Sequence, residues 1–219
     1  MKPLFLKWHL GAGDAIICNG LVRVLAQQYD EVILPAKHHN LATVAWMFSD
    51  LHKVTVVRVR DDTEMIDLGT VRYWKDRIGL GLWSDRGIQE KWSEGFYADA
   101  DVPFECRWSE FKLPTSVWCH GGKIWDIFWH DDPHRGYSIN LAAPKDSIYM
   151  PSSRKPFQDH LWPLETANEI HVIDSCFLCL ADSIPTNAKR HVLHAYATAH
   201  DPYKKFGPPT LRKNWEILR

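Results

Sequence analysis

The sequence predicts an α/β protein of two small Rossmann-like lobes with parallel sheets, and three observations predict this fold class. Apolar strand-like runs alternate with helix-like runs over residues 3–59. A glycine turn separates the first strand from the first helix, as in nucleotide-binding sheets. After a segment at 111–123 that contains Pro114, Gly121 and Gly122, the alternation begins again. Because strands that alternate with helices form parallel sheets, we expect one lobe over 1–115 and a second over 116–219.

The first lobe begins with an apolar strand over 3–10 and a helix that ends near Asp30. Apolar residues recur along that helix at helical spacing, from Ile16 to Leu25. Four valines in the six residues 54–59 indicate a strand. The remaining expected elements are a strand over 31–34 and a helix over 41–48. Residues 65–108 are charged, aromatic and weakly periodic, and this pattern predicts an irregular helical insertion, with a helix over 88–100.

The second lobe begins with an apolar run at 124–129 that predicts a buried strand ending in the polar string His130 to Gly136. The elements expected after it are a helix over 161–167, a strand over 169–173, a helix over 175–184 and a strand over 191–197. Strands and helices therefore alternate in the second lobe as they do in the first, although the two halves share no sequence repeat.

Composition excludes several classes of partner. The 26 Lys and Arg residues nearly balance 27 Asp and Glu residues, for a net charge of −1, so we expect no nucleic-acid partner. No apolar stretch reaches the roughly 18 residues that span a bilayer, and the first residues do not form a signal peptide. We therefore expect no transmembrane segment and a cytoplasmic protein. The five cysteines predict reduced thiols, and the Cys176–Cys179 pair predicts packing rather than zinc or redox chemistry.

The first candidate site is the string Leu10-Gly11-Ala12-Gly13-Asp14, between the first strand and its helix. Glycines let the backbone approach a ligand, and the N–H groups at a helix start favour anions. The dinucleotide fingerprint needs a third glycine where this chain has Ile16, which argues against classical NAD binding. The alternative is a plain turn in which Asp14 caps the helix.

Two further strings follow strands of the second lobe, at the sheet edge where open α/β sheets bind ligands. The first contains His130, Asp131 and Arg135, whose guanidinium suits phosphate oxygens. Its alternative interpretation is a surface loop with local ion pairs. The second delivers Asp174 and Ser175 to the start of a helix, where they could receive a diphosphate or simply cap the helix. The HDDPH string could suggest a metal site, but we expect no bound metal.

The string LGAGDAIICNGLVRVLAQQY resembles the opening of heptosyltransferase-type glycosyltransferases, which belong to glycosyltransferase family 9 and have the GT-B fold. IFWHDDPHRGYSI resembles the strand and loop of fucosyltransferase-like enzymes. The resemblance implies that Asp14 is the general base and that Arg135 contacts the donor diphosphate, with His130 and Asp131 orienting Arg135 or touching the nucleotide. The other residues that it places at the donor are Gly11, Gly13, Asp174, Ser175 and Cys176. Both lobes are shorter than is usual in that family.

The resemblance implies an inverting, metal-independent hexosyl- or heptosyltransferase that needs no cofactor. Its partners would be a nucleotide-sugar donor, which serves as co-substrate, and a glycan or other hydroxyl acceptor. The donor would bind mainly to the second lobe and the acceptor to the first, with Gly13 and Asp14 facing Arg135 and Ser175. Two alternatives stay open, namely a sugar-nucleotide epimerase or hydrolase on the same fold, and a nucleotide- or glycan-binding module without catalysis. A carboxylate of Asp14 that points into an open cleft favours catalysis, whereas one held in its own helix cap favours the binding module.

Overall fold

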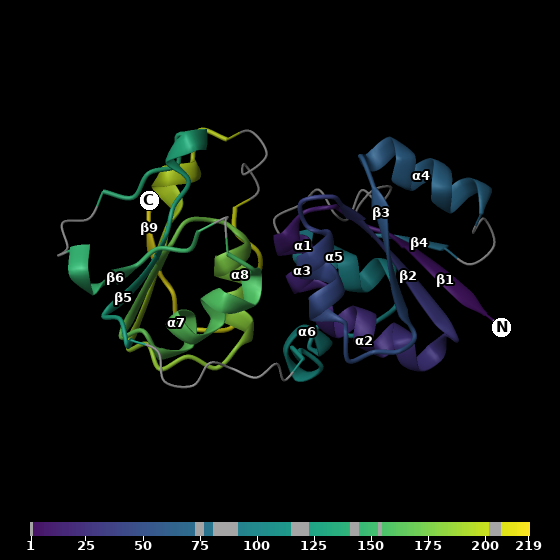
Figure 1. Cartoon of the computed structure of the whole chain (residues 1–219), viewed down its shortest axis with the longest axis horizontal. Helices are drawn as coiled ribbons and strands as arrows, with labels where there is room; N and C mark the ends of the chain where they lie inside the picture. Colours follow the sequence, from purple (N-terminus) through teal and green to yellow (C-terminus); the bar gives the residue numbers. More distant parts are fainter. Residues whose placement is uncertain are drawn as a thin grey trace. The chain divides into compact units, whose positions relative to one another are not determined.

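A computed structural model describes residues 2–72, 77–80, 92–114, 123–140, 145–152, 155–201 and 207–219. The chain divides into two compact units, Met1–Pro114 and Thr115–Arg219 (Figure 1). Each unit contains one sheet in which every pairing between strands is parallel, with helices packed against it. The predicted α/β fold class with parallel sheets is therefore confirmed.

The sheet of unit 1 has the strand order β3-β2-β1-β4. Its strands are β1 (Pro3–Lys7), β2 (Glu31–Lys37), β3 (Val54–Val59) and β4 (Arg77–Gly79). The helices of unit 1 are α1 (Ala12–Ile17), α2 (Asn19–Gln28), α3 (Leu41–Met47), α4 (Asp62–Val71), α5 (Trp92–Asp99) and α6 (Cys106–Ser109) (Figure 1). Helix α4 packs on the face of β1 that carries Phe5 and Lys7, and it does so through Gly69. A Cβ atom at Gly69 would lie 2.8 Å from Cδ1 of Phe5, so the close approach requires glycine.

Three predictions for unit 1 need correction. Strand β1 ends at Lys7 rather than at Leu10, because Trp8 is buried with its indole Nε1 donating to the carbonyl of Pro35 at 2.8 Å. The expected single helix is two helices that meet at Cys18, and the first starts at Ala12, so Gly13 and Asp14 belong to its first turn. The strand expected over 31–34 extends to residue 37.

The expected irregular insertion was wrong where the structure describes it, because α4 and β4 are regular elements. β4 pairs with β1 on the side opposite to β2, with Phe5 beside Arg77. A strand of three residues is too short to show periodicity, so the sequence pattern did not reveal it. Helix α5 lies within the expected 88–100 helix, whose first four residues fall outside the described part of the chain, as do residues 81–91 as a whole.

The sheet of unit 2 has the strand order β6-β5-β7-β8-β9. Its strands are β5 (Ile127–His130), β6 (Ile148–Tyr149), β7 (Glu169–Val172), β8 (Arg190–His194) and β9 (Glu216–Leu218). The helices are α7 (Leu161–Thr166) and α8 (Cys176–Ser183), with short 3-10 turns η2 (Pro133–Arg135), η3 (Lys145–Ser147), η4 (Phe157–His160) and η5 (Ala195–Thr198) (Figure 1). On one face Phe128 packs against Phe177 of α8, with ring centroids 5.4 Å apart. The cluster on the opposite face comprises Trp129, Tyr137, Ile139, Ile173 and Ala197.

The predicted elements of unit 2 are present with shifted ends, and two strands were missed. β5 begins three residues later than expected and includes His130 as its last residue. β8 ends at His194, and the 3-10 turn η5 replaces the rest of the expected strand. β6 and β9 contain only two and three residues, and nothing in the sequence pattern marks them. Of the expected boundary segment at 111–123, residues 115–122, with Gly121 and Gly122, lie outside the described residues.

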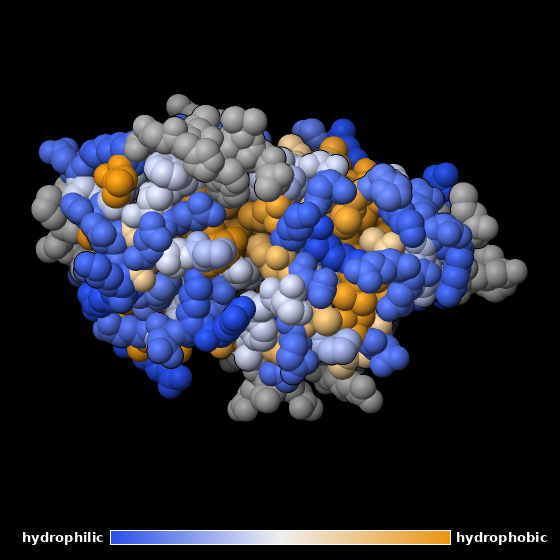
Figure 2. Space-filling model, turned by 90° about the horizontal axis from the view of Figure 1, so that it is seen from below, coloured by the Kyte–Doolittle hydropathy of each residue, from blue (hydrophilic) through white to orange (hydrophobic). Residues whose placement is uncertain are grey.

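Hydrophilic residues cover most of the face shown in Figure 2, and hydrophobic residues form smaller patches between them. Four large hydrophobic side chains are exposed in the described part of the chain, namely Ile124, Met150, Tyr196 and Ile217. Among the described helices, none is both long enough and apolar enough to cross a membrane.

Candidate functional site

Each sheet has one place where the strand order reverses, and such switch points are where open α/β sheets bind ligands beyond the carboxyl ends of their strands. In unit 1 the chain runs from β1 to β2 on one side and later returns to β4 on the other, so the switch point lies between β1 and β4. In unit 2 the chain runs from β5 to β6 and then to β7 on the opposite side of β5. All three candidate strings from the sequence lie where strands β1, β5 and β7 end, at these points.

Asp14 follows β1 as the third residue of α1, and its carboxylate folds back over Gly11. A side chain at position 11 would overlap Oδ2 of Asp14. Gly11 has φ −80° and ψ 146°, values that any residue adopts, so glycine is needed here for space and not for backbone freedom. Gly11, and not Asp14, is the N-cap residue, and the half-buried carboxylate lies at the favourable positive end of α1. Gly13 lies between them within the first turn of α1.

The structure brings together two of the predicted residues of unit 2, His130 and Ser175, at the switch point. β5 ends at His130, and β7 is followed by Asp174 and then Ser175, which precedes α8. Nδ1 of His130 lies 3.0 Å from Oγ of Ser175, a hydrogen-bonding distance. Two strings 45 residues apart in the sequence therefore form one polar site at the sheet edge.

His130 is neutral at pH 7 in this setting. Burial lowers the pKa of His130 to about 4, against the opposing effect of Asp131 and Asp132. Its ring packs on Phe177, with centroids 4.7 Å apart. Ser175 is the N-cap residue of α8, yet its hydroxyl bonds to His130 and makes no cap hydrogen bond. The simple capping role that the sequence offered for Ser175 is thus not the one its side chain takes.

Arg135 lies at the tip of a tight loop that follows His130. The loop is closed by paired backbone hydrogen bonds between Asp132 and Tyr137, and Gly136 adopts the left-handed conformation with φ 79° that favours glycine. Nε of Arg135 donates to Oδ2 of Asp132 at 2.6 Å, and the guanidinium lies 4.9 Å from the centre of the Tyr137 ring. The side chain of Arg135 remains 60% exposed, so it is paired locally but open to solvent.

The remaining predicted residues of unit 2 are Asp131, Asp174 and Cys176, which are neighbours of His130 and Ser175 in the sequence. Oδ2 of Asp131 accepts a hydrogen bond from the backbone N–H of Ile139 at 3.3 Å, which braces the loop. Asp174 is buried, and Cys176 is half-buried at the start of α8 and forms no disulfide with another described cysteine. In the described residues, no group of three or more His, Cys, Asp or Glu side chains is arranged to hold a metal ion.

Lys7 is a residue at the unit 1 switch point that the sequence interpretation missed. It is the last residue of β1 and is buried, and burial, followed by the nearby charge of Arg77, lowers the pKa of its ammonium group. The available signal was a lysine inside an apolar run where a strand was expected. Such a residue at a strand end is a functional candidate in its own right.

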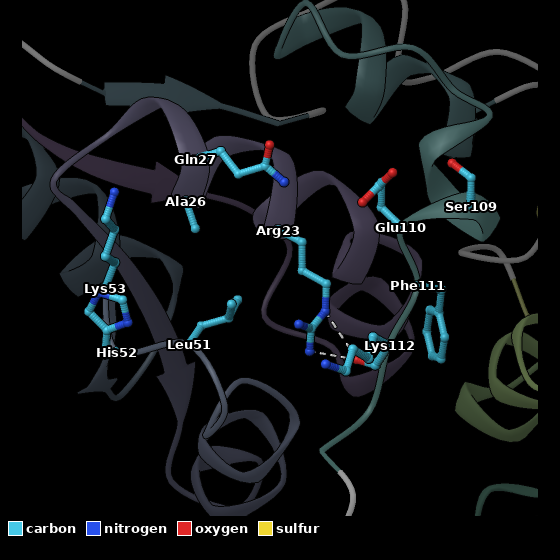
Figure 3. Close-up of a pocket in the computed structure, with 10 residues that line it drawn as sticks. All are labelled: Arg23, Ala26, Gln27, Leu51, His52, Lys53, Ser109, Glu110, Phe111 and Lys112. Carbon is cyan, nitrogen blue, oxygen red and sulfur yellow. Dashed lines mark hydrogen bonds between the residues drawn. The ribbon is translucent and has the colours of Figure 1, made fainter.

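A groove of the described residues lies elsewhere, at the amino-terminal edge of the unit 1 sheet (Figure 3). Its volume is about 460 Å³, and His52 and Lys53 lie opposite Glu110 and Lys112 across it. The guanidinium of Arg23, which lies between them, is already engaged within the protein. It pairs with Asp50 at 2.9 Å and donates to the carbonyl of Lys112 at 2.7 Å. Arg23 therefore ties α2 to neighbouring segments, and this groove contains none of the switch-point residues.

Two α/β units, each with a parallel sheet, are the architecture of a GT-B glycosyltransferase-like fold. The structure is similar to that of E. coli ADP-heptose LPS heptosyltransferase II, with a TM-score of 0.62 and 11% sequence identity over all of this chain and 90% of that chain. No protein-family model matches the sequence, and no curated protein is significantly similar to it. At this level of identity, the likeness establishes the fold.

Proposed function

We propose that this protein is a glycosyltransferase that moves a hexosyl or heptosyl group from a nucleotide-sugar donor to a hydroxyl acceptor, with inversion and without a metal ion. The observation that carries the proposal is the His130–Ser175 pair at the switch point of the unit 2 sheet. This pair places a neutral imidazole and a hydroxyl beside the start of α8, where N–H groups favour a diphosphate.

On the donor side, the start of α8 and the side chains of Ser175, His130 and Arg135 would stabilise the nucleoside diphosphate as it departs. The start of α8 offers backbone N–H groups, and Ser175 and His130 offer hydrogen bonds without adding charge. Arg135 offers a guanidinium fork, although a phosphate must compete with Asp132 for it. These donors act on the charge that develops on the leaving group, which is where electrostatic catalysis is most effective.

On the acceptor side, Asp14 would act as the general base. The acceptor oxygen attacks the anomeric carbon of the sugar while its proton passes to the Asp14 carboxylate. The bond from that carbon to the phosphate oxygen breaks, and its electron pair leaves with the nucleoside diphosphate. A single displacement of this kind inverts the configuration at the anomeric carbon.

Calorimetry with the diphosphates of uridine, guanosine, adenosine and cytidine tests the donor site. At least one should bind, and Ser175→Ala should weaken its binding by about tenfold, the worth of a charge-assisted hydrogen bond. Ser183→Ala is the matched control, since Ser183 lies at the other end of α8 and its hydroxyl donates to the carbonyl of Cys179. Absence of binding for all four, or an unchanged affinity in Ser175→Ala, contradicts the proposal.

One observation favours a second candidate, a binding module without catalysis. The Asp14 carboxylate lies against Gly11 at the start of its own helix, the arrangement expected of a residue that stabilises the helix. The variant Asp14→Asn distinguishes a glycosyltransferase from a binding module. Loss of a general base should slow specific donor hydrolysis by about 10² to 10⁴ while donor affinity stays unchanged. Equal hydrolysis by both proteins would favour the module.

A further inference from the structure

A chain of four hydrogen-bonded side chains crosses unit 2 on the sheet face opposite to α8. Oε2 of Glu169 lies 2.9 Å from Nε2 of His171, and Nδ1 of His171 lies 3.0 Å from Nε2 of His194. Nδ1 of His194 then lies 3.1 Å from the hydroxyl of Tyr196. Both imidazoles are 2% exposed, so these polar rings are stable only while every hydrogen bond is made.

The carboxylate of Glu169 sets the direction of the whole chain, because an ionised carboxylate only accepts hydrogen bonds. Nε2 of His171 therefore carries a proton, and in the neutral ring Nδ1 is an acceptor. Nε2 of His194 must donate to it, which leaves Nδ1 of His194 to accept from the Tyr196 hydroxyl. With one proton on each ring, every position along the chain has one donor and one acceptor.

The far end of the chain holds the loop that carries Arg135. The backbone N–H of Asn140 donates to the Tyr196 hydroxyl oxygen at 3.1 Å. A second anchor is separate from the histidines, because the Tyr137 hydroxyl donates to Oδ2 of Asp201 at 2.6 Å. The loop over 131–140 is thus fixed to the segment after β8 at two points, and one of them depends on the buried chain.

We propose that Tyr196 is a positioning residue for the donor site, held in place by the His194–His171–Glu169 chain so that it fixes the loop over 131–140 and with it Arg135. This inference rests on the proposed function for its link to the donor. Tyr196 touches no reacting group in this scheme and acts through the loop.

An added proton breaks the order of the chain and supplies a diagnostic signature. A His194 ring with two protons has no acceptor, so its Nδ1 donates to the Tyr196 hydroxyl oxygen, which can accept as well as donate. That oxygen then receives two donors, His194 Nδ1–H and the N–H of Asn140, and the hydrogen bond from Asn140 weakens. The other charged groups that act on His194 are Arg190 on its own strand and Glu216 on β9, and Glu169 on β7 pairs with both His171 and Arg190. Burial, then His171 and Arg190, lower the pKa of His194 to about 4, so the Asn140 anchor keeps its full strength at neutral pH and weakens in acid.

Amide hydrogen exchange followed by NMR tests the anchor without any nucleotide. In Tyr196→Phe the protection factor of the Asn140 amide should fall by about tenfold at pH 7, the loss expected for one hydrogen bond. The Lys213 amide, which donates to Asp182, should keep its protection. In the wild type, Asn140 protection should decline between pH 6 and 4, and Tyr137→Phe, which removes the other anchor, should retain this decline. Unchanged Asn140 protection in Tyr196→Phe overturns the proposal.

Nucleotide affinity then tests the link to the donor. Tyr196→Phe should weaken nucleoside diphosphate binding severalfold, and it should add nothing in an Arg135→Ala background, because both changes act through the same guanidinium. Lost Asn140 protection with unchanged affinity would overturn the positioning role while leaving the proposed function intact. If the wild type binds no nucleotide, the proposed function fails, and the positioning role fails with it even where the exchange data support the anchor.

Discussion

Gly11 and Gly20 are both positions without room for a side chain, but a methyl group would meet a different neighbour at each. At Gly20 it would overlap the backbone carbonyl oxygen of Cys106, which cannot move without shifting α6. At Gly11 it would overlap Oδ2 of Asp14, the end of a side chain that can rotate. Gly11 therefore sets the position of the Asp14 carboxylate, and Gly20 allows helices α2 and α6 to pack closely.

Replacing each glycine by alanine should separate these roles. Gly20→Ala should lower the free energy of unfolding by about 1 to 3 kcal/mol, the cost of overpacking a buried contact. Gly11→Ala should change it by less than about 1 kcal/mol, because only the Asp14 side chain must turn. Donor hydrolysis should nevertheless fall in Gly11→Ala if the place of that carboxylate matters. Urea denaturation measures the free energy of unfolding of each variant, and a hydrolysis assay measures the rate of donor hydrolysis. A normal hydrolysis rate in Gly11→Ala would count against Asp14 as the general base.

Arg135 should contribute to nucleotide binding against the competition of Asp132. Arg135→Ala should weaken nucleoside diphosphate affinity by about ten- to a hundredfold, the worth of one or two charge-assisted hydrogen bonds. Asp132→Asn should strengthen binding or leave it unchanged, because it releases the guanidinium from its partner at 2.6 Å. Calorimetry on both variants decides this, and equal affinity of Arg135→Ala and the wild type removes Arg135 from the site.

At the scale of elements, the sequence predicted long periodic helices and apolar strands but not the short strands that complete each sheet. β4, β6 and β9 contain three, two and three residues, and only their neighbours in the sheet stabilise them as strands. The candidate residues His130 and Ser175 could be predicted because each comes at or just after the end of an apolar run in the sequence. Their contact could not, since it depends on β7 lying beside β5, and strand order is a tertiary property.

The C-terminal strand β9 depends on the buried carboxylate of Asp182. That carboxylate accepts hydrogen bonds from the backbone N–H groups of Arg212 and Lys213 and from the indole of Trp215. Asp182→Ala should lower the free energy of unfolding by about 1 to 3 kcal/mol, because it leaves three partly buried donors without their acceptor. The amides of residues 216–218 should lose protection from exchange.

Glu216→Gln is the matched control for β9. Glu216 pairs with Arg190 on the exposed surface, and exposed ion pairs contribute little. Stability and exchange should therefore hardly change in this variant. If Asp182→Ala left the exchange of β9 as slow as in the wild type, Asp182 would not be the anchor.

At the scale of the whole molecule, buried histidines should make unit 2 sensitive to acid. Burial lowers the pKa values of His130, His160, His191 and His194, to about 4 for His130 and His194. The unfolded chain binds these protons near pH 6.5 while the folded unit does not, so stability is retained above pH 6.5 and lost as pH falls toward 4. His194 alone should cost about 3 kcal/mol over this range.

Urea denaturation at several pH values between 7 and 4 measures this loss. His194→Phe should be less stable than the wild type at pH 7, because it breaks the chain to His171, but its stability should fall less steeply with acid. A wild-type unfolding free energy that does not change between pH 6.5 and 4 would contradict the assignment of these histidines as neutral.

The two rounds of strand and helix alternation were enough to predict the fold class of the whole molecule. The switch points could not be predicted for unit 1, because β4 was hidden in a charged and aromatic segment. In unit 2 the polar string after β5 was recognised, but the local pairing of Arg135 with Asp132 depends on the turn at Gly136. Side-chain pairing within a loop follows from backbone conformation, which residue types alone do not specify.

The most direct test of the central claim is a crystal structure of the chain with the nucleoside diphosphate that binds best. The diphosphate should lie at the carboxyl edge of the unit 2 sheet, within hydrogen-bonding distance of Ser175 and the first N–H groups of α8, with His130 beside it. A nucleotide found instead in the groove of His52, Lys53 and Lys112, or at neither place, would contradict the account.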